Sequence, residues 1–142
     1  MTEQPARGVL LYDPDCGLCT KTAALMPRLG VDVQIRPMTP GELTAYGIDP
    51  MRAAREMPYV HPDRRVDFGH RAVSAILQAG PLAWRVLGRC LVLPGIDRMA
   101  GLGYRWVAEH REVLPGGTPS CALPRTPPPT PSGHSADGPV RG

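Results

Sequence analysis

The sequence has few aromatic residues and little excess charge of either sign. Phe, Trp and Tyr make up 5% of its 142 residues, too few for the aromatic platform on which proteins stack single-stranded nucleic acid. The formal net charge is only +3, and arginines are adjacent only at Arg64 and Arg65. A basic patch that would attract a phosphate backbone is therefore missing. We expect no nucleic-acid partner.

The sequence also lacks a long apolar run. A membrane-spanning helix takes about 20 apolar residues, whereas the first apolar run, Val9–Tyr12, is too short even for the core of a signal peptide. A later apolar segment, 84–93, contains Arg85 and Arg89, which would be costly in lipid. We expect a cytoplasmic protein with no membrane partner.

The composition changes sharply after Leu114. Before it, apolar and charged residues are mixed as in ordinary soluble globular proteins. Residues 115–142 are rich in Pro, Gly and Ser and contain almost no large apolar residues, so their burial could not offset the entropy lost on ordering. We predict one folded domain over 7–114 and a disordered tail over 115–142.

Cysteines number only four, and two of them are close together. Cys16 and Cys19 form a C-x-x-C pair where the run Val9–Tyr12 gives way to a helical pattern. Residues three apart on a helix face the same side, which permits a disulfide. The first turn also offers unpaired backbone N–H groups and the positive end of the helix dipole, both of which favour a thiolate. In a reducing compartment such a pair is more often catalytic or metal-binding than structural.

The hydrophobic periodicity alternates between strand and helix along the chain. Thr39-Pro40-Gly41-Glu42 has the spacing of a capping box, and Asp49-Pro50 is a second helix-start signal. The expected elements are a strand at 9–12, a helix over 18–29 interrupted at Pro27, a strand at 31–35, helices from 40 and from 50, a hairpin over 59–68, a helix over 72–77, and helices at 82–93 and 96–112.

This order, with the cysteine pair at the first helix, is the thioredoxin topology. We therefore predict an α/β fold: a thioredoxin-like mixed sheet flanked by helices, with two extra C-terminal helices packed on the sheet. A shared topology raises the expectation of redox chemistry without establishing an activity.

Several segments resemble one known family. Residues 11–19 resemble the Y-D-x-D-C-x-x-C signature of the DCC family of thiol-disulfide oxidoreductases, which are small bacterial thioredoxin-like proteins. The hairpin followed by Gly69 and Ala72, and the Y-x-x-x-A-x-x-R pattern over 104–111, resemble later parts of that family. The resemblance implies thiol-disulfide exchange without a cofactor. The expected partners are a disulfide-containing protein or low-molecular-weight thiol and an electron donor that the sequence does not identify.

In such a mechanism Cys16, the more amino-terminal and, we expect, the more exposed thiol, attacks the substrate disulfide, and Cys19 resolves the mixed disulfide. Two acidic residues join the candidate catalytic set. Asp15 is preferred as the helix cap, although its charge beside Cys16 should raise the thiol pKa. Asp13 either relays protons for Cys19 or hydrogen-bonds the turn, and the sequence does not decide between the two.

The substrate groove is expected opposite the dithiol. Thioredoxin-like proteins commonly carry a cis-proline there, and Met57-Pro58 occupies the corresponding place. The alternative is a trans proline that only ends a helix. Gly69 and His70 return toward the same end of the sheet and complete the candidate substrate-binding set. For His70 an ordinary surface role is preferred.

Two other classes compete with the enzyme hypothesis. One is a zinc protein, but Cys90 and Cys121 lie far from the C-x-x-C pair and no histidine pair has finger-like spacing, so we expect no metal. The other is a non-catalytic thioredoxin-like interaction module. Cys90 has the helical spacing of a buried thiol. Cys121 falls in the tail, where it either reaches the dithiol or another molecule or, as we prefer, has no role.

Overall fold

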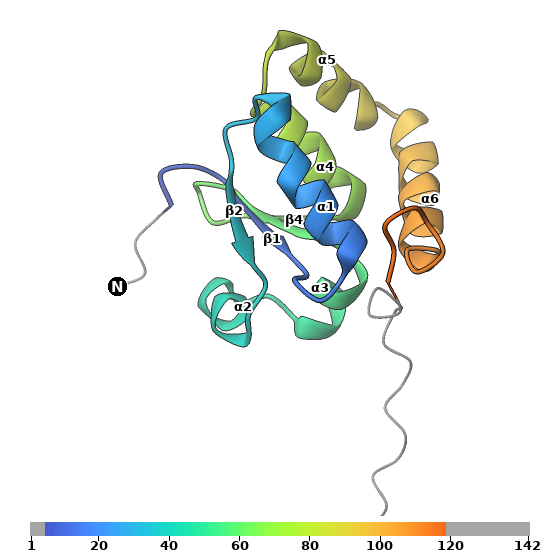
Figure 1. Ribbon diagram of the computed structural model, residues 1–142. Helices are drawn as coiled ribbons and strands as arrows, with labels where there is room; N and C mark the ends of the chain where they lie inside the picture. The colour runs from blue at the N-terminus through green and yellow to red at the C-terminus, as the bar shows by residue number, and fades with distance from the viewer. Residues whose placement is uncertain (1–4, 119–142) are drawn as a thin grey trace, which may run out of the picture.

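The computed structural model describes residues 5–118 and confirms the predicted α/β architecture (Figure 1). Four strands form one mixed sheet in the order β2-β1-β3-β4. β1 (Val9–Tyr12) is parallel to β2 (Gln34–Pro37) and antiparallel to β3 (Pro58–Val60), and β4 (Val66–Phe68) pairs antiparallel with β3. The central position of β1 brings the segment that follows it, with the cysteine pair, to the middle of one end of the sheet.

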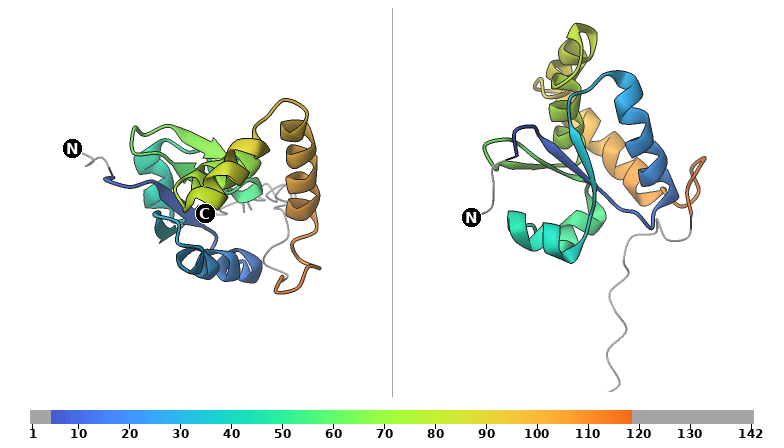
Figure 2. Two further views of the ribbon diagram at one scale, coloured as in Figure 1. Left: turned by 90° about the horizontal axis from the view of Figure 1, so that it is seen from above. Right: turned by 60° about the vertical axis from the view of Figure 1, so that its left-hand side comes forward.

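The two faces of the sheet are covered by different helices (Figure 2). α1 (Gly17–Leu25) continues as the 3-10 helix η1 (Met26–Leu29), which shares one face with α4 (Gly69–Gln78). The short helices α2 (Pro40–Tyr46) and α3 (Pro50–Arg55) cover the other face. Helices on both faces therefore protect the sheet from solvent.

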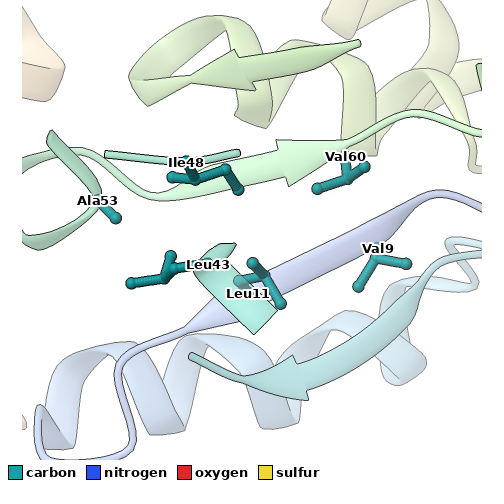
Figure 3. Packing of buried hydrophobic residues seen from close by; sticks show 6 residues of the cluster. All are labelled: Val9, Leu11, Leu43, Ile48, Ala53 and Val60. Atoms are coloured by element: carbon teal, nitrogen blue, oxygen red, sulfur yellow. The ribbon is translucent and has the colours of Figure 1, made fainter. Parts of the chain in front are cut away.

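Side chains alternate across β1, as a strand requires. Val9 and Leu11 point to the face under α2 and α3 (Figure 3), whereas Leu10 points to the face under η1 and α4. All three are at most 1% exposed. The core therefore has two halves, and its members are Val9, Leu11, Leu43, Ile48, Ala53 and Val60 on one face and Leu10, Val31, Tyr59, Ala72 and Ile76 on the other.

Both predicted helix starts are confirmed. The Thr39 side chain accepts a hydrogen bond from the Glu42 N–H at 3.2 Å, and the Asp49 side chain accepts one from the Met51 N–H at 3.1 Å. The first helix also ends as predicted, at Gly30 with a left-handed φ of 69°. These helix starts and ends could be predicted from the sequence because each capping contact involves residues within one helical turn of each other.

The second strand begins later than predicted. Residues 31–33 show the expected alternation, but the parallel register pairs Val9 with Gln34 and Tyr12 with Pro37. The Asp32 N–H instead donates to the Ala79 carbonyl at 3.0 Å. Residues 31–33 are thus held by the end of α4 and not by β1, so the prediction of a strand at 31–35 was wrong in its start.

The two C-terminal helices, α5 (Leu82–Leu91) and α6 (Ile96–Glu109), pack mainly on α4 and not on the sheet. The expectation that they cover the sheet was wrong, because both faces are already occupied by other helices. Cys90 on α5 is partly exposed, so its predicted full burial was also wrong. No helix within residues 5–118 has both the length and the apolar character to cross a bilayer.

Gly88 on α5 packs closely against α4. A Cβ at this position would lie 2.7 Å from the Ser74 carbonyl oxygen and 3.1 Å from Leu77 Cβ. Gly88→Ala is therefore expected to lower the free energy of unfolding by about 1–3 kcal/mol. Gly103→Ala on α6, where nothing lies within 4 Å, should instead raise it by up to about 1 kcal/mol. Urea denaturation checks both, and an unchanged midpoint for Gly88→Ala would contradict this packing.

Candidate active site

The cysteine pair lies at the amino-terminal end of α1, immediately after the turn that leaves β1. Asp13 organises this turn, since its Oδ1 accepts the Asp15 N–H at 2.9 Å and its carbonyl accepts the Cys16 N–H at 3.3 Å. Cys16 is the N-cap residue, with extended φ and ψ of −92° and 111°, and Cys19 follows in the first turn of α1. The local geometry thus places both thiols at the positive end of the helix dipole.

Asp15 does not cap α1, so that prediction was wrong. The N-cap residue is Cys16, and its side chain makes no capping hydrogen bond. The cap comes from the far end of the described chain, where the Thr118 hydroxyl accepts the Gly17 N–H at 3.3 Å and donates to the Asp15 carbonyl at 3.4 Å. Local sequence could not reveal this contact, because the two segments lie about a hundred positions apart.

Burial of the two cysteines is the reverse of the prediction. Cys16 is 0% exposed, whereas Cys19 is partly exposed. Residues 116–118 lie directly against the start of α1 (Figure 1), so that a Cβ on Gly17 would be 2.7 Å from the Gly116 carbonyl oxygen and 2.8 Å from Thr118 Cγ2. The segment after α6 thus covers the start of α1. The strand and helix periodicity of the sequence did not predict this contact.

The sulfur atoms are in different states. Cys16 is disulfide-bonded, whereas Cys19 and Cys90 are free thiols. The bond made by Cys16 therefore does not join it to Cys19. Cys121 lies outside the described residues.

Arg111 is a site residue to which the sequence analysis gave no role. Its Nη1 donates to Cys19 Sγ at 3.9 Å, while Nη2 donates to the Ala54 carbonyl and Nε to the Ala108 carbonyl, both at 3.0 Å. The guanidinium thus joins the thiol to α3 and to the end of α6. These contacts hold the positive charge beside the sulfur.

Tyr104 on α6 makes a second contact between this helix and the rest of the fold. Its hydroxyl accepts the Met57 N–H at 2.9 Å, and burial raises the pKa of the phenol. Tyr104 and Arg111 are seven positions apart, about two helical turns, so they face the same side. The Y-x-x-x-A-x-x-R spacing was the available signal, because it places a tyrosine and an arginine on the same side near the end of the last helix, where both can contact the segments packed against it.

Opposing influences act on the Cys19 pKa. Burial raises the pKa of the thiol above its ordinary value, and the nearby Asp13 carboxylate raises it further. Arg111 lowers the pKa through its charge and its hydrogen bond, and the Asp13 backbone also lowers it through a hydrogen bond. Burial is the largest of these influences. Arg111 is therefore the main group that makes a Cys19 thiolate accessible.

The candidate substrate-binding residues are only partly brought together. Pro58 is buried at the start of β3 and pairs with Phe68. Residues 5–118 contain no cis peptide bond, so the Met57–Pro58 bond is trans and the cis-proline expectation was wrong. The Met57 carbonyl accepts the Gly69 N–H at 3.2 Å, which brings Gly69 close to this proline.

His70 faces α6 and not the cysteines. Its Nε2 lies 2.7 Å from Asp97 Oδ1, and this hydrogen bond holds the pKa of the Asp97 carboxyl below its usual range. Gly69 and His70 line a hollow between α4 and α6 together with Tyr104. Neither Cys16 nor Cys19 lines that hollow. Within residues 5–118 there is no cluster of three or more His, Cys, Asp or Glu side chains that could hold a metal ion.

The cysteine pair and Arg111 lie within a stretch that matches a known family model. The chain has no match among curated proteins and none among solved structures. A family model described as DCC1-like thiol-disulfide oxidoreductase matches residues 10–117, a stretch that begins in β1 and ends in the segment lying against α1. It includes Cys16, Cys19 and Arg111, and it confirms the resemblance found in the sequence. The chain therefore belongs to the DCC1-like thiol-disulfide oxidoreductase family.

Proposed function

We propose that the protein catalyses thiol-disulfide exchange with Cys16 as the nucleophile and Cys19 as the resolving thiol. The observation that carries this proposal is the arrangement at the start of α1. A helix N-terminus lies behind both cysteines, and the Arg111 guanidinium is 3.9 Å from Cys19 Sγ. Both features stabilise a thiolate, the form of cysteine that attacks a disulfide.

The reaction has two steps. The Cys16 thiolate attacks one sulfur of a substrate disulfide, and the other substrate sulfur leaves as a thiolate and takes up a proton. Cys19 then attacks Cys16 Sγ in the mixed disulfide, which releases the second substrate thiol and oxidises the Cys16–Cys19 pair. The two electrons lost by this pair reduce the substrate, and an unidentified donor restores the dithiol.

Asp13 is suited to assist the second step. Its carboxylate raises the Cys19 pKa, and its backbone forms a hydrogen bond with the same thiol. We propose that it accepts this proton as Cys19 attacks, while its hydrogen bond to the Asp15 N–H keeps the turn in place.

Substrate access to Cys16 requires a local movement. The residue is 0% exposed, and the backbone of 116–118 lies over Gly17 next to it. We propose that this segment moves away from the start of α1 before a substrate disulfide binds. Substrates are protein or low-molecular-weight disulfides, with Pro58, Gly69 and His70 as candidate contacts.

A trapping experiment tests the assigned roles. The reduced Cys19→Ser/Cys121→Ser protein, treated with glutathione disulfide, is expected to accumulate a glutathione adduct on Cys16, because it lacks both the resolving thiol Cys19 and the tail thiol Cys121. Wild type and Cys90→Ser should instead proceed to an internal disulfide. Intact mass under non-reducing conditions distinguishes these products. A double variant that stays free of glutathione on Cys16 would refute the nucleophile assignment.

A further inference from the structure

The outer face of α6 is apolar. Met99, Leu102 and Trp106 follow one another at helical spacing, and each of these side chains is more than half exposed. Positions three and four apart form one row on a helix. On the opposite face of α6, Ala108 is buried and Tyr104 is partly buried. We call Met99, Leu102 and Trp106 the α6 stripe.

Exposed apolar side chains are concentrated in this part of the chain. Within residues 5–118, the large apolar side chains that are exposed outside 82–113 are Leu25 and Met51 alone. Figure 1 shows α5 and α6 at the outer side of the fold, where α5 adds the exposed Leu82 and Val86. Exposed apolar side chains gathered in one region mark a surface that contacts another molecule or a membrane.

Arginines accompany the α6 stripe. Arg98 and Arg105 flank it on α6, and Arg85 and Arg89 lie on α5. All four side chains are exposed, and within residues 5–118 none of them forms an ion pair. Glu109 is the one exposed carboxylate that the two helices carry. The surface therefore combines apolar side chains with unpaired positive charge.

We infer that the α6 stripe and its neighbouring arginines bind a membrane surface that carries anionic lipids. A helix that lies in the plane of the head groups inserts its apolar side chains, while its basic residues attract anionic lipids. Tryptophan is enriched at the boundary between membrane and water. The Trp106 ring is held at this surface by stacking on His110, with ring centroids 4.7 Å apart.

Charge favours a lipid surface over a second copy of the chain. A twofold interface through the α6 stripe would use the same patch on both copies, so Arg98 and Arg105 of one copy would approach those of the other. Like charges brought together in an interface are unfavourable. Anionic head groups would instead neutralise these arginines.

Binding of this kind was not expected from the sequence, because its apolar runs are too short to span a bilayer. Binding at the membrane surface requires only an apolar face with basic neighbours. Periodicity predicts that a helix has an apolar face, but only the fold shows that part of this face on α6 points outward. Thiol exchange by the cysteine pair does not require a membrane, so either proposal can hold without the other.

Cosedimentation with sucrose-loaded vesicles tests membrane binding of the full, reduced chain. The protein is expected to sediment with vesicles of equal parts phosphatidylcholine and phosphatidylglycerol, and to stay in solution with phosphatidylcholine alone. Leu102→Asp should lower the partition coefficient more than about tenfold, because it removes an inserted side chain and adds a charge that anionic lipids repel. Met51→Asp, the same kind of change at an exposed position of α3, should leave it nearly unchanged.

Two charge-matched variants test the arginines. Arg98→Gln/Arg105→Gln should weaken binding to the anionic vesicles about 25-fold, at roughly fivefold for each arginine. Arg28→Gln/Arg55→Gln removes the same charge from exposed positions outside 82–113 and should change binding little. All these variants should react with glutathione disulfide as fast as wild type, which separates a failure of membrane binding from a failure of the proposed function.

Several results would overturn the membrane assignment. One is a wild-type protein that does not sediment with the anionic vesicles. Another is an equal loss of binding in Leu102→Asp and Met51→Asp, or in the two arginine variants, because binding would then not depend on α6. A dimer in light scattering that Leu102→Asp separates, without vesicle binding, would show that a second copy covers the α6 stripe.

Discussion

Replacing Arg111 with glutamine is expected to slow resolution by Cys19 about tenfold at neutral pH, because the Cys19 thiolate loses its hydrogen bond to a charged group. Arg111 lowers the pKa of a thiol that burial raises, so its removal moves the pKa further upward. Less Cys19 is then ionised at neutral pH. The two proteins should resolve the mixed disulfide at the same rate at a pH above the Cys19 pKa of the variant, because Cys19 is then a thiolate in both.

The pH dependence of Cys19 alkylation by iodoacetamide measures this effect. The modified cysteine is located by fragmentation of the tryptic peptide 8–21, and the midpoint of the rate profile should shift to higher pH in Arg111→Gln. Arg111→Lys is the matched control, because it keeps the charge but loses the planar group that also binds the Ala54 and Ala108 carbonyls. Its midpoint should lie between those of wild type and the glutamine variant. Equal midpoints in all three proteins would show that Arg111 does not tune Cys19.

Much of the fold could be predicted because its signals are local. The run Val9–Tyr12, the caps at Thr39 and Asp49 and the hairpin over 59–68 each depend on residues close in sequence. Contacts between residues far apart in the sequence could not be predicted from these local patterns. Residues 31–33 alternate as a strand, but the Asp32 N–H binds the end of α4. The last two helices pack on α4, since other helices cover both faces of the sheet.

The candidate site divides in the same way. The C-x-x-C pair at the start of α1 was predictable from spacing alone. The contacts around it were not, because Thr118 and Arg111 approach α1 across about a hundred and about ninety positions of sequence. The helix cap was therefore assigned to Asp15, and Cys16 was expected to be exposed. In the fold, the chain after α6 provides the cap and lies beside the buried thiol.

The second large effect is expected for the nucleophile itself. Cys16→Ser should slow oxidation by glutathione disulfide on the order of a hundredfold, because burial raises the pKa of Cys19, the thiol of the pair that remains, so that little of it is the reactive thiolate at neutral pH. Cys90→Ser serves as the parent for this comparison, since Cys90 is partly exposed and would add a background reaction. Circular dichroism should confirm that serine at position 16 leaves the fold unchanged.

The most direct test of the account follows the loss of free thiols in this parent and in its Cys16→Ser derivative, by intact mass after blocking at timed intervals. The parent should rapidly lose two thiols together and retain no glutathione, while the derivative should react slowly and retain bound glutathione. If the derivative oxidised as fast as its parent, Cys16 would not be the reactive group, and a dithiol enzyme built on the start of α1 would be contradicted.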